Sequence, residues 1–250
     1  MNWAATSRHA FRLAIGLIVA ALGYALVHQT SVDRFIAADT EGLNTLITLI
    51  GSIYAVMFAF VIFVIWGQFT EVENAALREC SLLNELLRVN QYLNPDANRA
   101  TRRSVGEYAQ RVANSEWPSL GQGRKDPSTE KAFAVLMNLV IRTAPASADE
   151  EALVTRLIDI TRKLSQQRDE RIAKSLTRIP PTLLALVRIM AGTLLLLVFW
   201  YPFHSWLVGL FGFVLLAVIL FLSNVVMTDT DNPFDGIFNV SPRPFSELML

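Results

Sequence analysis

The sequence predicts an all-α membrane protein: a four-helix transmembrane bundle with a large helical cytoplasmic insert between the second and third spans. Two observations support this fold class. The 250-residue chain is 52% hydrophobic, yet it contains 22 Lys and Arg residues and 22 Asp and Glu residues. The apolar residues form long runs near both ends, the charged residues lie mostly in the middle, and no segment shows the alternation typical of strands.

The same composition excludes some classes of protein. A formal net charge of zero gives no reason to expect nucleic acid as a partner. The single cysteine, Cys80, excludes an intrachain disulfide and a multi-cysteine metal site. His9, His28 and His204 have no nucleophile or acid partner in a recognisable pattern, and no glycine-rich phosphate loop is present. We therefore do not expect an enzyme.

Four apolar runs are candidates for crossing a bilayer, whose hydrocarbon core requires about 20 helical residues. They are residues 11–27, 46–66, 183–201 and 206–227. The first run is the shortest and contains Arg12, and we expect a retained helix rather than a cleaved signal peptide. Only the residues PFHS separate the last two runs, which predicts a tight hairpin. The expected regions are an N-terminal transmembrane pair (1–69), a cytoplasmic helical domain (70–180), a C-terminal transmembrane hairpin (181–228) and a cytoplasmic tail (229–250).

Basic residues beside the spans indicate the orientation. Arg8 and Arg12 are near the N-terminus, and a basic group from Arg168 to Arg178 precedes the third span, whereas the loop 28–45 has only Arg34. Because basic residues favour the cytoplasmic side, both termini and the insert are expected in the cytoplasm. We further expect a multi-pass protein of a bacterial inner membrane.

The insert is predicted to contain helices separated by prolines. The first ends before Pro95, a second (96–118) stops at Pro118, and a third begins near Pro127 and closes before Pro145. A capping box of Ser147 and Glu150 opens the last helix, which runs towards Ile179 and is broken by the two following prolines. Two apolar stripes are expected to be buried: Val72, Ala76, Cys80, Leu83 and Leu87 on the first helix, and Leu153, Leu157, Ile160 and Leu164 on the last. The segment SPRPF in the tail is expected to be extended rather than helical.

The second span contains a bulky stripe at every fourth position. Its members are Ile50, Tyr54, Phe58 and Ile62. In a ring of subunits such a stripe would line an axial path and gate ion flow by dewetting. The alternative is that the stripe faces lipid or neighbouring helices.

Arg188 lies within the third run, where a charge is costly and often functional. Two interpretations are open. Because Arg188 is near the start of the run, its side chain can extend to the headgroup region. If it instead faces a water-filled path, it would attract anions.

Three aspartates follow the last span: Asp229, Asp231 and Asp235. Carboxylate oxygens are ligands that calcium prefers, so calcium is a possible cofactor. The alternative is solvated capping, although acids are mildly unfavourable at the negative end of a helix, which suggests a cation nearby.

Several short motifs resemble those of the bestrophin-like integral membrane proteins of unknown function. They are SEWP at 115–118, QQRDERIAKSLTRIPP at 166–181 and DNPFDGIFNVSPRPF at 231–245. That family is similar in layout to the bestrophins, pentameric anion channels in which the second span lines a hydrophobic neck. The resemblance implies that Asn232, Pro233 and Phe234 form the turn that follows the last span in bestrophins. It also offers a competing register for the neck, with Ser52 and Val56.

The chain departs from bestrophins after this turn. Asp235 intervenes before Gly236, and IFNVSPRPF stands where the acidic calcium clasp should be. The aspartates could therefore hold calcium only with help from a neighbouring subunit or the cytoplasmic helices.

The resemblance implies a channel that conducts small anions such as chloride through the axial pore of a homo-oligomer, expected to be a pentamer. The alternative function is a non-conducting scaffold or signalling protein whose cytoplasmic helices bind a partner. It is motivated by the long amphipathic helix 147–179 and by the missing acidic clasp.

Overall fold

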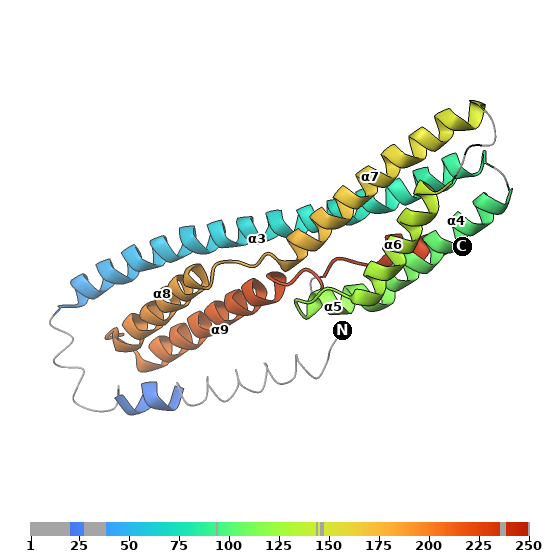
Figure 1. The fold of residues 1–250 in the computed structure, drawn as a ribbon. Helices are drawn as coiled ribbons and strands as arrows, with labels where there is room; N and C mark the ends of the chain where they lie inside the picture. Colours follow the sequence, from blue (N-terminus) through green and yellow to red (C-terminus); the bar gives the residue numbers. More distant parts are fainter. Residues whose placement is uncertain are drawn as a thin grey trace. The chain divides into compact units, whose positions relative to one another are not determined.

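The computed structural model describes residues 21–27, 39–93, 95–143, 145, 148–235 and 239–249, and it contains no strand among them (Figure 1). The all-α prediction is confirmed. The chain forms two compact units. The first comprises Met1–Trp66 with Ile179–Asp231, and the second comprises Gly67–Arg178 with Asn232–Leu250. Helix α3 (Thr40–Asn90) is continuous from the first unit into the second.

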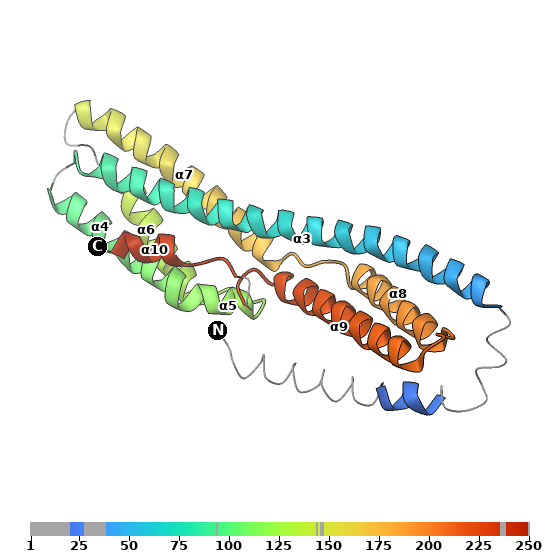
Figure 2. The same cartoon turned by 180° about the vertical axis from the view of Figure 1, so that it is seen from behind.

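The first unit is built around a helical hairpin. Helices α8 (Pro181–Trp200) and α9 (Trp206–Thr230) lie antiparallel and side by side, joined by the predicted short turn (Figures 1 and 2). Pro181 occupies the first turn of α8, where a missing N–H has no cost, so the predicted break after the last insert helix is confirmed. Within the described residues, three helical stretches are long and apolar enough to cross a membrane, one each in α3, α8 and α9.

Most of the first predicted span lies outside the described residues, but residues 21–27 are helical. Tyr24 is fully buried there and stacks on Phe213 of α9, with ring centroids 5.6 Å apart. A Cβ at Gly209 would lie 2.0 Å from the Tyr24 hydroxyl oxygen. Glycine is therefore required where this helix approaches α9.

The second unit is a helical bundle closed by the C-terminal tail. Its helices are α4 (Pro95–Arg111), the π-helix η2 (Val112–Glu116), α5 (Trp117–Gly121), α6 (Pro127–Ile141), α7 (Ala148–Leu176), α10 (Arg243–Ser246) and the 3-10 helix η3 (Glu247–Met249). Figure 2 shows α10 beside α4. Helix α6 begins at the predicted proline, and the Asp126 carboxylate caps it by accepting from the Thr129 amide at 2.9 Å. The predicted capping residue Ser147 lies outside the described residues.

Two predictions of local structure in this unit were wrong. Helical backbone continues through Pro118 to Gly121, because this proline stands in the first turn of α5, where its missing amide is tolerated. The SPRPF segment is not wholly extended, because Arg243–Ser246 forms a helical turn with prolines at and after its N-cap. Proline has the backbone angle of a first helical turn, so it starts this turn rather than preventing it.

The predicted apolar stripes face the core of the second unit. Val72, Ala76 and Leu83 of α3 and Leu157, Ile160 and Leu164 of α7 are almost fully buried, whereas Leu87 and Leu153 are partly buried.

Cys80 is a buried thiol at the edge of this core and provides a test of its packing. Burial, followed by the nearby Glu79 carboxylate, raises the pKa of the Cys80 thiol well above its usual range. We expect folded protein to resist alkylation by N-ethylmaleimide at pH 8 and to react fully in denaturant. Because the pKa of the thiol is higher in the folded than in the unfolded protein, Cys80 contributes fully to the free energy of unfolding below the unfolded pKa of about 8.5. This contribution is lost as the pH rises above that value towards the folded pKa. Rapid labelling of the folded protein would contradict this packing.

Candidate functional site

Two members of the predicted stripe on α3, Tyr54 and Ile62, face residues of their own chain. Tyr54 and Ile62 are partly buried and pack on a cluster that includes Val61, Val187 and Met227, and Tyr54 stacks on Phe58 with ring centroids 5.9 Å apart. The opposite face of α3 is not covered by any other described residue of the chain. It is formed by Leu49, Ile53, Val56, Phe60 and Phe63, of which Val56 is 70% exposed. The competing register, with exposed Ser52 and Val56, lies on this uncovered face. Which face lines a path stays a prediction.

Arg188 is exposed and bonded to the neighbouring helix of the hairpin. Its Nε–H donates to Asn224 Oδ1 at 2.9 Å and its Nη2 donates to Thr228 Oγ1 at 3.2 Å. Thr228 is one turn closer than Asn224 to the end of α9. The side chain therefore extends towards the end of the hairpin where α8 starts and α9 finishes, which favours the first of its two interpretations.

The three candidate calcium ligands have separate surroundings. Asp231 Oδ1 accepts a hydrogen bond from the Ile179 amide at 3.0 Å. Asp229 is partly buried near the end of α9, and Asp235 is exposed. Across the part of the chain that the structure describes, no three acidic, histidine or cysteine side chains are grouped to hold a metal ion. Calcium binding at Asp229, Asp231 and Asp235 stays a prediction.

The turn after the last span anchors the tail to the second unit. Asn232 Nδ2 donates to Gly121 O at 2.8 Å, and Asn232 Oδ1 accepts from Arg178 Nη2 at 3.2 Å. Phe234 packs edge-on against Trp117, with centroids 4.8 Å apart, and Trp117 Nε1 donates to Val240 O at 2.9 Å. The turn Asn232-Pro233-Phe234 thus makes a structural joint between α5 and the tail.

A buried network of charged groups lies at the centre of the second unit, and the sequence analysis missed it. Arg171 is fully buried and donates from Nε to Glu79 Oε2 and from Nη2 to Glu116 Oε2, each at 2.7 Å. Arg168 Nη2 contacts Glu116 Oε1 at 2.8 Å and reaches the more exposed Glu130 at 3.1 Å. The two buried arginines of α7 thus balance the charge of the two buried glutamates, one from α3 and one from η2.

Aromatic rings surround these charges. The Tyr108 hydroxyl donates to Glu79, and the Arg168 guanidinium lies 5.0 Å from the ring centroid of Phe133. The Arg171 guanidinium lies 5.5 Å from the Trp117 ring and 5.4 Å from that of Phe245 in the tail. Burial, followed by the Glu79 charge, raises the pKa of Tyr108 well above its usual range. The network therefore connects α3, α4, η2, α7 and the tail. Its contacts hold these elements together, which indicates a structural role.

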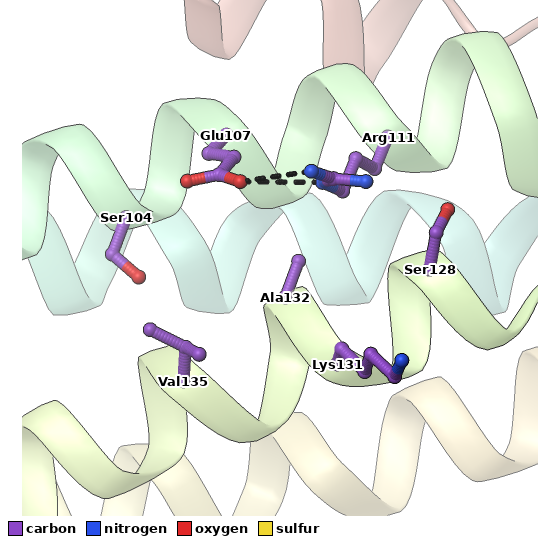
Figure 3. Close-up of a pocket in the computed structure, with 7 residues that line it drawn as sticks. All are labelled: Ser104, Glu107, Arg111, Ser128, Lys131, Ala132 and Val135. Carbon is purple, nitrogen blue, oxygen red and sulfur yellow. Dashed lines mark hydrogen bonds and ion pairs between the residues drawn. The ribbon is translucent and has the colours of Figure 1, made fainter.

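A small pocket lies between α4 and α6 (Figure 3). Glu107 and Arg111 form an ion pair at 3.1 Å on one wall, and Ser128 and Lys131 lie on the other. The ion pair is solvent-exposed and joins residues of one helix, so the pocket offers no preorganised catalytic or metal-binding group.

Comparison with solved structures identifies the fold. A bacterial bestrophin homolog from Klebsiella pneumoniae superposes with a TM-score of 0.71 and 15% sequence identity, covering 96% of this chain and 95% of that one. A point variant of a bacterial bestrophin homolog from Klebsiella pneumoniae gives a TM-score of 0.69 at 15% identity over 97% and 98% of the two chains. A point variant described only as a membrane protein gives 0.72 at 14% identity over 96% and 95%. The fold is therefore that of bestrophin-like membrane proteins.

The sequence itself matches the Bestrophin-like domain over residues 14–245. The chain belongs to the Bestrophin-like family, which confirms the resemblance inferred from its short motifs. No curated protein matches it in sequence.

Proposed function

We propose that the protein is an ion channel that conducts small anions such as chloride through the axis of a homo-oligomer, with a pentamer as the expected assembly. Membership of the Bestrophin-like family supports a channel rather than an enzyme. The structural observation that carries the proposal is the apolar face of α3, from Leu49 to Phe63, which the residues that the structure describes leave uncovered. Copies arranged around an axis would place a row of such side chains along a shared ion path. A narrow apolar constriction in that path can gate ion flow by dewetting.

The face of α3 that lines the path has two candidate registers. The first is the stripe Ile50, Tyr54, Phe58 and Ile62, and the second includes Ser52 and Val56. Packing of Tyr54 and Ile62 on their own chain favours the second register. Neither choice requires calcium. If Asp229, Asp231 and Asp235 do hold calcium between copies, conduction should depend on the calcium concentration.

Chloride efflux from liposomes containing the purified protein tests this proposal. We expect flux above that of empty vesicles, and an increase of several-fold for Val56→Ala, because a smaller side chain weakens a dewetted barrier. Tyr54→Ala and Phe58→Ala test the first register in the same assay. Leu215→Ala of α9, which is also exposed, is the matched control and should leave the flux unchanged.

Vesicles that stay silent across a range of pH and calcium concentrations would contradict the channel. Particle symmetry in detergent provides an independent check. A monomer or dimer would leave no axial path and would favour the alternative of a scaffold or signalling protein.

A further inference from the structure

Arg188 carries a positive charge that the hairpin positions but does not neutralise. It is the only Lys or Arg of α8, and α9 has none. Its two acceptors, Asn224 Oδ1 and Thr228 Oγ1, are uncharged, and within the described residues no carboxylate pairs with it. An arginine in a membrane-spanning hairpin normally needs an anion or water to compensate its charge.

Arg188 lies close to the end of the hairpin at which α8 begins. It is the eighth residue of α8, which begins at Pro181, so its backbone lies about 10 Å along the helix from that end. Side chains on a helix lean towards the N-terminus, which for α8 is this same end. The bond from Nη2 to Thr228, close to the end of α9 at Thr230, shows that the side chain follows this direction. With this end of the hairpin at the membrane surface, the guanidinium would lie at the level of the lipid phosphates.

The neighbouring groups fix the orientation of the guanidinium. Thr228 Oγ1 donates to Asn224 O at 2.7 Å, so its lone pairs are available to accept from Arg188. Nε and Nη2 are engaged on α9, and Nη1 has no acceptor among the residues that the structure describes. A planar guanidinium with free donors recognises phosphate oxygens well.

Space for a lipid chain lies on the same face of α8. Ala185 and Gly192, one turn to either side of Arg188, are exposed. A Cβ added at Gly192 would meet no atom within 4 Å. An acyl chain could therefore lie along α8 with its headgroup at Arg188.

We propose that Arg188, held by Asn224 and Thr228, binds the phosphate group of an anionic phospholipid in the leaflet at this end of the hairpin. The site does not depend on ion conduction. Its ligand is a membrane component rather than a permeating ion, and the test below separates a lipid phosphate from free phosphate.

Native mass spectrometry of the full-length protein in detergent tests the site. Delipidated protein is titrated with phosphatidylglycerol, and bound lipids are counted. We expect Arg188→Gln to weaken the tightest binding about tenfold, as loss of one charge-assisted contact of about 1.4 kcal/mol implies. The double variant Asn224→Leu and Thr228→Val keeps the charge but loses the orientation, so it should weaken binding by a smaller factor.

Arg102→Gln is the matched control, because Arg102 is an exposed arginine of α4 in the other unit. It should bind lipid as the unchanged protein does. Equal binding by Arg188→Gln and the unchanged protein, with helical content and thermal stability preserved in both, would overturn the proposal. If Arg188→Gln were misfolded, Arg188→Lys would be tested in its place. Lysine keeps the positive charge but lacks the planar guanidinium, so lipid binding by Arg188→Lys equal to that of the unchanged protein would also contradict the proposal.

The source of the phosphate is tested by competition. Excess inorganic phosphate should not displace the bound phosphatidylglycerol, because the acyl chains contribute to binding. The assignment to lipid would be overturned if inorganic phosphate displaced phosphatidylglycerol and also stabilised the protein against thermal unfolding only when Arg188 is present. That result would show a site for free phosphate. A structure of the assembly with a second copy covering Arg188 would also overturn it.

Discussion

Arg171→Met is expected to lower the free energy of unfolding of the second unit by about 3–5 kcal/mol, because it leaves the buried Glu79 carboxylate without its cationic partner. Arg171 contacts both Glu79 and Glu116, and the three side chains are at most 1% exposed. Arg168 can still pair with Glu116, but Glu79 would keep only the Tyr108 hydroxyl. The largest part of the cost therefore comes from the desolvated charge of Glu79.

Hydrogen exchange of the amides in α7 measures this effect in the intact protein. A loss of about 3 kcal/mol lowers the protection of the most stable amides roughly a hundredfold. Arg162→Met is the matched control on the same helix. Arg162 is 69% exposed and pairs with Asp159 at 2.9 Å, so its loss should cost about 0–1 kcal/mol. Similar effects for the two variants would show that the buried network does not hold the unit together.

A second substitution separates the unpaired charge from lost packing. Adding Glu79→Met to Arg171→Met removes the carboxylate that has lost its partner, so much of the stability should return. An additive, larger loss in the double variant would instead indicate that packing around Arg171 dominates.

The helices and their cores could largely be predicted from the sequence, because proline positions and apolar periodicity are local signals. Pro127 and Pro181 mark helix starts, and the stripes on α3 and α7 are buried as predicted. Pro118 was misinterpreted because a proline ends a helix only when it lies in the interior of that helix. Here the π-helix Val112–Glu116 precedes it, so Pro118 lies in the first turn of α5. The sequence contains no pattern that predicts this π-helix.

The charged network was missed for a different reason. The buried face of α7 continues from Leu164 through Arg168, Arg171 and Ser175 at the same three- and four-residue steps, all of them almost fully buried. Because arginine is usually found at the protein surface, the predicted buried stripe was ended at Leu164. The continued three- and four-residue spacing indicated that the arginines lie on the buried face. The glutamates that neutralise them come from other helices, however, and a single sequence does not show which glutamate contacts which arginine.

The same limit applies to α3. Periodicity shows that Ile50, Tyr54 and Phe58 share a face, but not whether that face meets its own chain or another copy. The cluster with Val187 and Met227 is a tertiary contact, and it decides how the helix is rotated within its unit.

Trp117→Ala should cost about 3–5 kcal/mol and release the tail from the second unit. Trp117 is 5% exposed and contacts the tail three times, through Phe234, Val240 and Phe245. Its ring also lies against the Arg171 guanidinium. Truncation therefore removes the surface on which the tail rests and one wall of the charged network, a combined loss larger than that of an ordinary core residue.

Hydrogen exchange of residues 239–249 provides the readout, since the Val240 amide is held by Pro233 O at 2.7 Å only while the tail is docked. Trp117→Phe keeps the ring but removes the bond to Val240 O, so it should cost only about 1 kcal/mol. Tyr92→Ala truncates an aromatic residue that is 69% exposed and should leave the tail protected. If the tail stayed protected in Trp117→Ala, its attachment would have to come from the Asn232 bonds, and the aromatic contacts would not be what holds the tail within the second unit.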